Sequence, residues 1–183
     1  MTSPMTLTVE RAATVPALTL RPWRDSDIPA IVAAYRDQAM RRWLGNSIDD
    51  EDEARSMLAR QDAGWADGTR LSWAIEKEST VVGHFVIKAA SPPETLATGV
   101  GYWTVSEARG KGIASRCLET ATEWLFGGQD IMPADEIELL HTVGNAGSCR
   151  VAQKCGYVLE SVLAPMPPKF PSEGHRHLRK RPA

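Results

Sequence analysis

The chain has 183 residues, of which 43% are hydrophobic and 24% are charged, and its formal net charge is −2 at pH 7. A chain of this length can bury one hydrophobic core, so we expect a single compact domain. Its 21 Lys and Arg and 23 Asp and Glu leave no global positive charge for binding a phosphate backbone, which argues against a nucleic-acid partner. No apolar run approaches the roughly 18 residues that cross a bilayer, and the N-terminal residues lack a secretory signal pattern. We therefore expect a cytoplasmic protein without a membrane partner.

The N-terminal third of the sequence predicts one strand and two helices. Residues 1–16 show little periodicity and are expected to form a loose lead-in, which leaves residues 17–183 as the domain. Residues 17–23 alternate in the manner of a strand. Apolar side chains recur at helical spacing over residues 28–35 and again after the acidic residues 49–53, which favour a helix start through the helix dipole.

The rest of the sequence predicts alternating strands and helices. Period-two patterns over residues 71–76 and 81–88 predict a hairpin, and residues 98–105 predict a further strand. Apolar residues then repeat at helical spacing up to Gly127, which we expect to end a long helix. The remaining expected elements are a strand over 136–142, a helix over 146–155, a strand over 157–163 and a polar strand over 174–179.

The cysteines and histidines give no sign of disulfides or of a metal site. Three cysteines without a CxxC pair cannot close a full disulfide framework, so we expect free thiols in a reducing compartment. Of the four histidines, only His175 and His177 are close in sequence. Because zinc sites in sequences usually show more ligands at close spacing, we expect no metal.

The run Arg109-Gly110-Lys111-Gly112-Ile113-Ala114 lies between a predicted strand and a predicted helix. Its glycines allow a sharp turn, and the unpaired amides of the first helical turn form an anion site that the two cationic side chains reinforce. The sequence contains no Walker A loop. It also lacks a GxGxxG fingerprint, since Ser115 stands where the third glycine would be. Taken alone, the turn is either a diphosphate site or purely structural.

A second set of motifs accompanies this turn. Arg109, Gly112 and Ala114 resemble the R/QxxGxG/A acetyl-CoA signature of the GNAT superfamily of N-acetyltransferases. The GYW run at 101–103 and residues 145–157 are similar to the ribosomal-protein N-acetyltransferase (RimJ/RimL-like) branch, whose pattern is GYW, RGKGIA and N-x-x-S-x-x-V-A-x-K-x-G-[FY]. The resemblance covers most of the chain, and the order and spacing of the motifs make it specific.

The resemblance implies an α/β (α+β) fold and acetyl-CoA as co-substrate. A single domain would contain a mixed, mostly antiparallel sheet, splayed between its fourth and fifth strands and flanked by helices. The pantetheine arm would enter that gap, and the side chain of Asn145 would meet it. The other implied cofactor-binding residues are the strand residues Trp103, Thr104 and Val105 and the turn residues Arg109, Gly110, Lys111, Gly112, Ile113 and Ala114.

The implied reaction is direct attack of a primary amine on the thioester. A protein or peptide N-terminal amine is the favoured acceptor, because its pKa of about 7.7 to 8.0 leaves far more free base at neutral pH than a lysine pKa of about 10.4 does. The alternatives are a small-molecule amine, such as an antibiotic or a polyamine, and a non-catalytic acyl-CoA-binding module. Homodimers are frequent among similar proteins, but no sequence feature establishes one here.

The residue that would protonate the departing sulfur differs from the pattern of the superfamily. Ala152 occupies the position of a Tyr that donates a proton to the departing sulfur, and Ser148 is the replacement candidate, unless its hydroxyl caps the helix. A main-chain N–H near the end of the fourth strand, with Val105 favoured, could face the thioester oxygen as negative charge develops.

The residue that would act as general base also differs from related sequences. Gly99 replaces a Glu of related sequences, so no carboxylate is available at that position. His141 has a suitable ordinary pKa near 6.5, although a structural histidine that is hydrogen-bonded to a neighbouring strand is the favoured interpretation. His84 is a weaker candidate, and a water chain to solvent is a third option.

The acceptor side has few sequence markers. The acidic residues 49–53 could attract a cationic amine or could simply favour a helix start. Trp43, Trp65 and Trp73 could line an acceptor pocket or could belong to the core. Residues 165–171 lie where similar proteins often place an acceptor-side loop.

Overall fold

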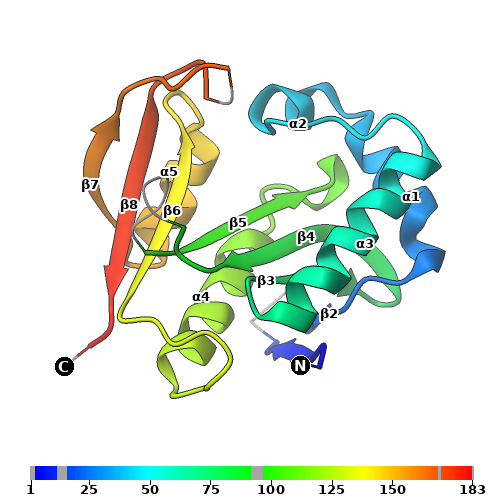
Figure 1. Cartoon of the computed structure of the whole chain (residues 1–183), viewed down its shortest axis with the longest axis horizontal. Helices are drawn as coiled ribbons and strands as arrows, with labels where there is room; N and C mark the ends of the chain where they lie inside the picture. The colour runs from blue at the N-terminus through cyan, green and yellow to red at the C-terminus, as the bar shows by residue number, and fades with distance from the viewer. Residues whose placement is uncertain (1–2, 12–15, 92–96, 169, 183) are drawn as a thin grey trace.

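The computed structural model describes residues 3–11, 16–91, 97–168 and 170–182, and these form one eight-stranded sheet with helices on both faces (Figure 1). The strand order is β1-β2-β3-β4-β5-β6-β8-β7, and neighbours are antiparallel except for β5 and β6, which are parallel. The strands are β1 Leu7–Val9, β2 Leu18–Arg21, β3 Arg70–Lys77, β4 Thr80–Lys88, β5 Thr98–Thr104, β6 Glu136–Thr142, β7 Val158–Leu163 and β8 Gly174–Lys180. This architecture confirms the predicted fold class.

Two apolar clusters hold the helices against the sheet. One cluster joins α1 and α3 to Trp103 of β5. The other packs α4 and the buried side of α5 against the opposite face of the sheet. The helices are α1 Ile28–Tyr35, α2 Gln38–Trp43, α3 Glu51–Asp67, α4 Ile113–Phe126 and α5 Ala146–Lys154, with short 3-10 helices at Asp25–Asp27 and Ser106–Ala108. Among the described residues, no helix has the length and apolarity to span a bilayer.

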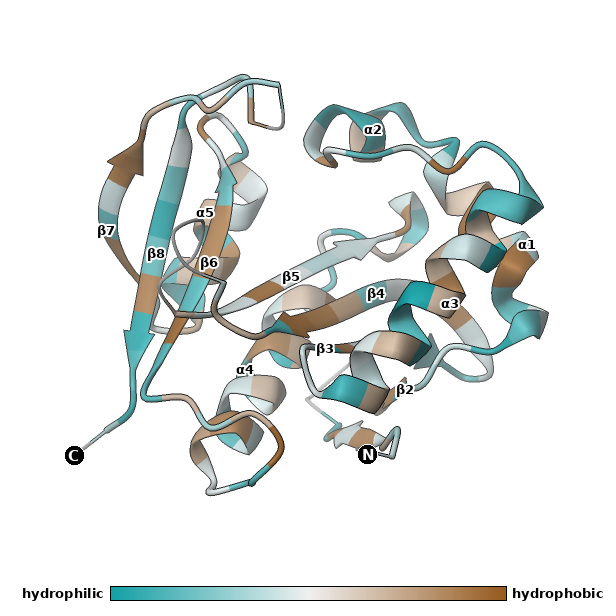
Figure 2. Ribbon diagram, in the orientation of Figure 1, coloured by the Kyte–Doolittle hydropathy of each residue, from teal (hydrophilic) through white to brown (hydrophobic). Residues whose placement is uncertain are grey.

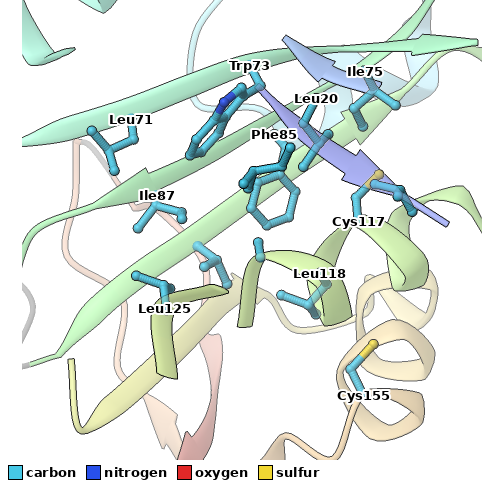
Figure 3. Close-up of a cluster of buried hydrophobic side chains, with 14 of the residues drawn as sticks. Leu20, Leu71, Trp73, Ile75, Phe85, Ile87, Cys117, Leu118, Leu125 and Cys155 are labelled. Carbon is cyan, nitrogen blue, oxygen red and sulfur yellow. The ribbon is translucent and has the colours of Figure 1, made fainter. Parts of the chain in front are cut away.

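The larger cluster lies between β3, β4 and α4 (Figure 3). Alternate residues of the two strands point the same way, and residues four or seven apart on α4 meet them, as the sequence periodicity predicted. Burial of these side chains is the main stabilising contribution of this region, at about 25 cal/mol per Å² of apolar surface. The fully buried members include Leu71, Trp73, Ile75, Phe85, Ile87, Cys117, Leu118 and Leu125.

The sheet separates between β5 and β6, where the splay was predicted. The two strands pair only from Thr98 to Val100 on β5, opposite Ile137 to Leu139 on β6. Beyond this point β5 keeps β4 as its only strand partner among the described residues. In Figure 1 the two arrows diverge from a common origin.

Two short elements were not predicted. Leu7 and Val9 in the expected lead-in form β1, pair with β2 and are buried. The six-residue α2 is capped by the preceding Asp37, whose carboxylate accepts bonds from the main-chain N–H groups of Ala39 and Met40. Both elements are too short for their periodicity to show in the sequence.

Candidate active site

A cleft of about 680 Å³ opens where β5 and β6 separate. Its walls come from the end of β5 (residues 102–104), the turn before α4, the start and one side of α5, and α2. The cleft brings together the two segments that the sequence singled out, the glycine turn and the region from Asn145 to Ser148. A second cavity of about 590 Å³ lies on the other side of the turn, against α1 and the start of β4.

The glycine turn presents three unpaired amides. Gly110 and Gly112 have φ values of +73° and +71°, which other L-residues rarely adopt. Gly112 caps α4, and the first amide bonded to its carbonyl oxygen belongs to Arg116, at 3.1 Å. The N–H groups of residues 113–115 are therefore left without helical partners at the positive end of the helix dipole. This arrangement fits an anion such as a diphosphate.

Two basic side chains lie at the turn in different roles. Arg109 donates to the Asp37 carboxylate at 2.6 Å and to the Thr104 carbonyl at 3.2 Å, so it ties the turn to α2 and β5. Partial burial opposes ionisation of Asp37, but Arg109 and two main-chain amides still hold its pKa below the ordinary value. Lys154 of α5 lies with its Nζ 4.0 Å from the position that a Cβ at Gly112 would occupy.

Sequence reasoning missed Lys154, although it belongs to the quoted motif. Arg150, one helical turn earlier on α5, also lines the cleft and was missed. Both residues follow from helical spacing once α5 is known to face the turn, but the sequence alone does not show that α5 packs there.

The expected cofactor residues divide between the two cavities. Trp103, Thr104, Arg109, Gly110, Gly112, Ile113, Ala114 and Asn145 line the cleft, whereas Val105 and Lys111 line the second cavity. The main-chain N–H of Val105 donates to the Val82 carbonyl at 3.0 Å, so it is not free to face a thioester. Because hydrogen bonds alternate along an antiparallel strand, the amides of Tyr102 and Thr104 point to the open side of β5 instead.

Asn145 and Ser148 begin α5 at the cleft. The Asn145 side-chain oxygen accepts a bond from the main-chain N–H of Ser148 at 3.1 Å and so caps the helix. Asn145, rather than the Ser148 hydroxyl, therefore provides the side-chain cap of α5. Beside it lies Tyr102, whose pKa burial raises to about 12, opposed by the nearby Ser148 hydroxyl. The buried Tyr102 hydroxyl makes no hydrogen bond of normal geometry to the described residues, and sequence reasoning missed it because its depth depends on packing.

The two candidate histidines lie outside the lining of the cleft. Nδ1 of His141 is 2.9 Å from the Thr142 carbonyl and its Nε2 is 3.2 Å from Nε2 of His177. Burial, and more weakly the neighbouring histidines, lower the pKa of His141. His84 is 7% exposed and accepts a bond from the Trp23 indole at 3.1 Å, and burial lowers its pKa to about 3. The geometry places both rings away from a substrate in the cleft.

Of the residues expected on the acceptor side, some line the cleft and others lie elsewhere. Trp43 lines the cleft with Met40 and Leu44, whereas Trp65 and Trp73 pack edge to face in the core with ring centroids 5.0 Å apart. The acidic residues 49–53 do not line the cleft; they cap α3 and pair with basic neighbours. In the expected acceptor-side loop, Met166 and Phe170 pair through their main chains, and residue 169 lies outside the described residues.

Comparisons with known proteins agree with this geometry. The family described as "Acetyltransferase (GNAT) domain" matches residues 17–158, and no curated protein matches the chain. The fold is similar to RimJ of Mycobacterium smegmatis in complex with CoA-disulfide, with a TM-score of 0.76, 20% identity, and coverage of 90% of this chain and 82% of that one. It is also similar to the Salmonella typhimurium acetyltransferase that modifies the N-terminal serine of ribosomal protein L7/L12, with a TM-score of 0.78, 20% identity, and coverage of 96% and 99%.

A third similar structure is the microcin C7 self-immunity acetyltransferase MccE in complex with acetyl-CoA and AMP. Its TM-score is 0.74 at 15% identity, and the match covers 89% of this chain and 92% of that one. The fold and the cleft define the class of the protein as an acetyltransferase. Because the family match extends over residues 17–158, the chain belongs to the GNAT acetyltransferase family.

Proposed function

We propose that the protein transfers the acetyl group of acetyl-CoA to a primary amine, and that a protein or peptide N-terminal amine is its preferred acceptor. One observation carries the proposal: the turn with three unpaired amides opens into the same cleft as Asn145 and Ser148. The three cysteines are free, which fits a cytoplasmic location for this reaction.

The cleft offers binding groups along its length. The amides of residues 113–115 fit the diphosphate of CoA, and Lys154 and Arg150 add positive charge on the opposite wall. The main-chain N–H groups of Tyr102 and Thr104 fit the amide-rich pantetheine arm, because they lack strand partners on the β6 side. Each group is already fixed by β5, α4 or α5, which reduces the entropy lost on binding.

The chemistry requires a new C–N bond and cleavage of the C–S bond. The free amine attacks the carbonyl carbon, and the Tyr102 or Thr104 amide stabilises the negative charge on the carbonyl oxygen. The thiolate then leaves and takes a proton from the Ser148 hydroxyl, which is replenished from solvent. The amine loses its proton to water, because neither His141 nor His84 lines the cleft.

The acceptor side favours a substrate that presents some apolar surface. Met40, Trp43 and Leu44 of the α2 region form that wall of the cleft. An N-terminal residue with its side chain could pack there while its α-amine reaches the thioester. The likeness to an acetyltransferase of N-terminal serine supports this acceptor, and the likeness to MccE keeps small amines as the alternative.

The test is acetyl-CoA turnover with a library of N-terminal peptides and a panel of antibiotics and polyamines, measured by thiol release and mass spectrometry. We expect acetylation of peptide N-termini. Transfer only to small amines would mean that the acceptor is a small-molecule amine and not a peptide N-terminus. CoA binding without transfer to any acceptor would leave a non-catalytic binding module, and no binding at millimolar CoA would reduce the turn to a structural role.

A substitution in the turn tests where CoA binds. Gly112→Glu places bulk and negative charge at the anion site, so we expect CoA affinity to fall at least about tenfold by calorimetry. Gly128→Glu is the matched control, because Gly128 also has a positive φ (+82°), lies in open space and is remote from the cleft lining. Equal CoA affinity in the two variants would remove the assignment of the turn.

A further inference from the structure

Three histidines and one cysteine meet on the sheet face that α5 covers, outside the lining of the cleft. They are His141 of β6, Cys149 of α5 and His175 and His177 of β8, and we call them the His/Cys cluster. One nitrogen or sulfur atom from each lies within 4.8 Å of all the others. The sequence did not show this group, since its members come from three elements.

The strand register explains why the three rings share one face. His141 is directly opposite His175 in the antiparallel pair of β6 and β8. His177 is two residues further along β8, and side chains two apart point to the same face. Cys149, on the second turn of α5, then approaches all three rings from above the sheet.

Four of the six distances between ligand atoms in the cluster are close to the edges of a zinc tetrahedron, and the other two are within 4.8 Å. With Zn–N of about 2.0 Å and Zn–S of about 2.3 Å, tetrahedral geometry places two nitrogens about 3.3 Å apart and sulfur about 3.5 Å from nitrogen. The Nε2 atoms of His141 and His177 are 3.2 Å apart. The Cys149 sulfur is 3.4 Å from His141 Nε2, 3.3 Å from His175 Nδ1 and 3.8 Å from His177 Nε2.

Hydrogen bonding also prepares the cluster for a cation. The Thr142 carbonyl can only accept, so the Nδ1 atom of His141 carries the proton and its Nε2 directs a lone pair at the other members. A thiol has a single proton and cannot satisfy three imidazole nitrogens at once. A carbonyl that orients the ring from behind is the usual second partner of a metal-binding histidine.

We propose that His141, Cys149, His175 and His177 bind one Zn²⁺ ion in a structural, four-coordinate site. Four protein ligands leave no open position for substrate, which distinguishes a structural from a catalytic zinc site. Binding converts the Cys149 thiol to a thiolate and releases its proton to the buffer. The partly exposed His141, Cys149 and His175 provide an entry path, and His177 is 1% exposed at the base.

The ion would join β6, β8 and α5 at the point where α5 forms a wall of the cleft. Cys149 follows Ser148 directly, so the site would fix the start of α5 without contacting the reacting atoms. The proposal replaces the expectation that the protein binds no metal. It does not depend on the proposed function, because metal binding is measured without turnover.

The experiment is metal titration of the full-length protein after removal of metals with a chelator. Zn²⁺ is added in competition with a chromophoric chelator, and Co²⁺ is added separately as a spectroscopic probe. We expect one Zn²⁺ per chain with a Kd of about 100 nM or tighter. Co²⁺ should give the intense visible bands of a tetrahedral site and a thiolate-to-cobalt charge-transfer band in the near ultraviolet.

Variants with matched controls assign the ligands. We expect Cys149→Ser to remove the charge-transfer band and His175→Gln to weaken Zn²⁺ binding, each by about a hundredfold or more in affinity. Cys155→Ser, directly after the end of the same helix, and His84→Gln on β4 make the same changes outside the cluster and should bind Zn²⁺ as the wild type does. If Cys149→Ser fails to fold, the partly exposed His175 still provides the test.

Zn²⁺ should also raise the unfolding temperature. At a free concentration of a hundred times Kd, the increase should be about 5 to 10 °C for the wild type and for both controls, and absent in the two cluster variants. Zinc affinity that is unchanged in both cluster variants would overturn the proposal. A weak Co²⁺ spectrum without a charge-transfer band would also overturn it.

Discussion

The two halves of the sheet on either side of the splay differ in the proportion of polar side chains that they bury. The half from β1 to β5 encloses large apolar residues such as Trp73 and Phe85, which are fully buried. The half made of β6, β8 and β7 buries Glu138 and His177 beside the apolar Ile137 and Leu139, and the Glu138 carboxylate accepts from Arg176 at 2.8 Å. Figure 2 shows the contrast as brown stretches on β4 against the mainly teal β8.

Because of this difference, we expect the first half to contribute most of the stability of the fold and the second half to depend more on the exact placement of polar groups. Apolar burial is non-directional and independent of pH, so the first half can supply most of the free energy of unfolding. Ion pairs and imidazoles need particular geometry and charge states, so the second half should respond to substitutions and ions that leave the first half unchanged. The first half also contains one buried ion pair, Arg21 with Asp27 at 2.7 Å, where β2 leads into α1.

The largest expected effect tests the apolar half. Trp73→Ala should lower the free energy of unfolding by about 3 to 5 kcal/mol, because the ring packs against Trp65, Phe85 and Trp124 in a site without solvent. Urea denaturation measures the loss. Trp43→Ala, at the edge of the cleft, is the control and should cost about 1 kcal/mol or less. Similar losses in both variants would contradict the dominance of this core.

The next prediction concerns the buried ion pair of the second half. Arg176→Met should cost about 2 to 4 kcal/mol, because it leaves the Glu138 carboxylate buried without its partner. Arg55→Met is the matched control, since Arg55 pairs with Glu51 and Asp52 on the exposed surface of α3, and we expect no measurable change. If Arg176→Met is also neutral in urea denaturation, the ion pair does not hold this half together.

A smaller effect is expected from pH in the apolar half. Because the folded pKa of His84 is about 3 and the unfolded value is about 6.5, the unfolded chain binds the extra proton and stability falls as the pH drops below about 6.5. Between pH 7 and pH 5 the loss from this residue should be about 2 kcal/mol.

His84→Gln keeps an acceptor for the Trp23 indole but does not titrate. The variant should therefore lose about 2 kcal/mol less than the wild type between these two pH values, measured by urea denaturation at each. An unchanged pH dependence would mean that other groups carry the acid sensitivity.

The smallest expected effect is a change in kcat that tests which half supplies the proton to the leaving sulfur. Ser148 belongs to α5 of the second half, and Tyr102 belongs to β5 of the first. Ser148→Ala should lower kcat about tenfold, equivalent to about 1.4 kcal/mol, with little change in the KM for acetyl-CoA, because a thiolate leaves with modest assistance. A larger kcat loss in Tyr102→Phe than in Ser148→Ala would assign the proton to the first half.

Local sequence patterns predicted most of the fold. The α4 helix follows from the recurrence of Leu118, Ala121 and Leu125, and the β3–β4 hairpin follows from two consecutive runs with a period-two pattern, because each signal is contained within one element. Three-residue β1 and six-residue α2 escaped prediction, since their stability comes from pairing with β2 and from the Asp37 cap near Arg109.

The site could be predicted only where its chemistry is local. The glycine turn was found because the positive-φ glycines and the helix start are adjacent in sequence. The preference for the Val105 amide was wrong, because the direction of each N–H depends on the register of β5 against β4. The His/Cys cluster escaped notice for a similar reason: its members meet only because β8 pairs with β6.

The position of β8 also determines when the second half can form during synthesis. β8 follows β7 in the sequence but lies between β6 and β7 in the sheet, and among the described strands β7 pairs with β8 alone. A nascent chain can pair β1 to β5 on the ribosome, but β7, with its exposed Val158 and Val162, has no neighbour until residues 174–180 have been translated. The wall of the cleft that carries α5 therefore reaches its final support only after the last strand has emerged.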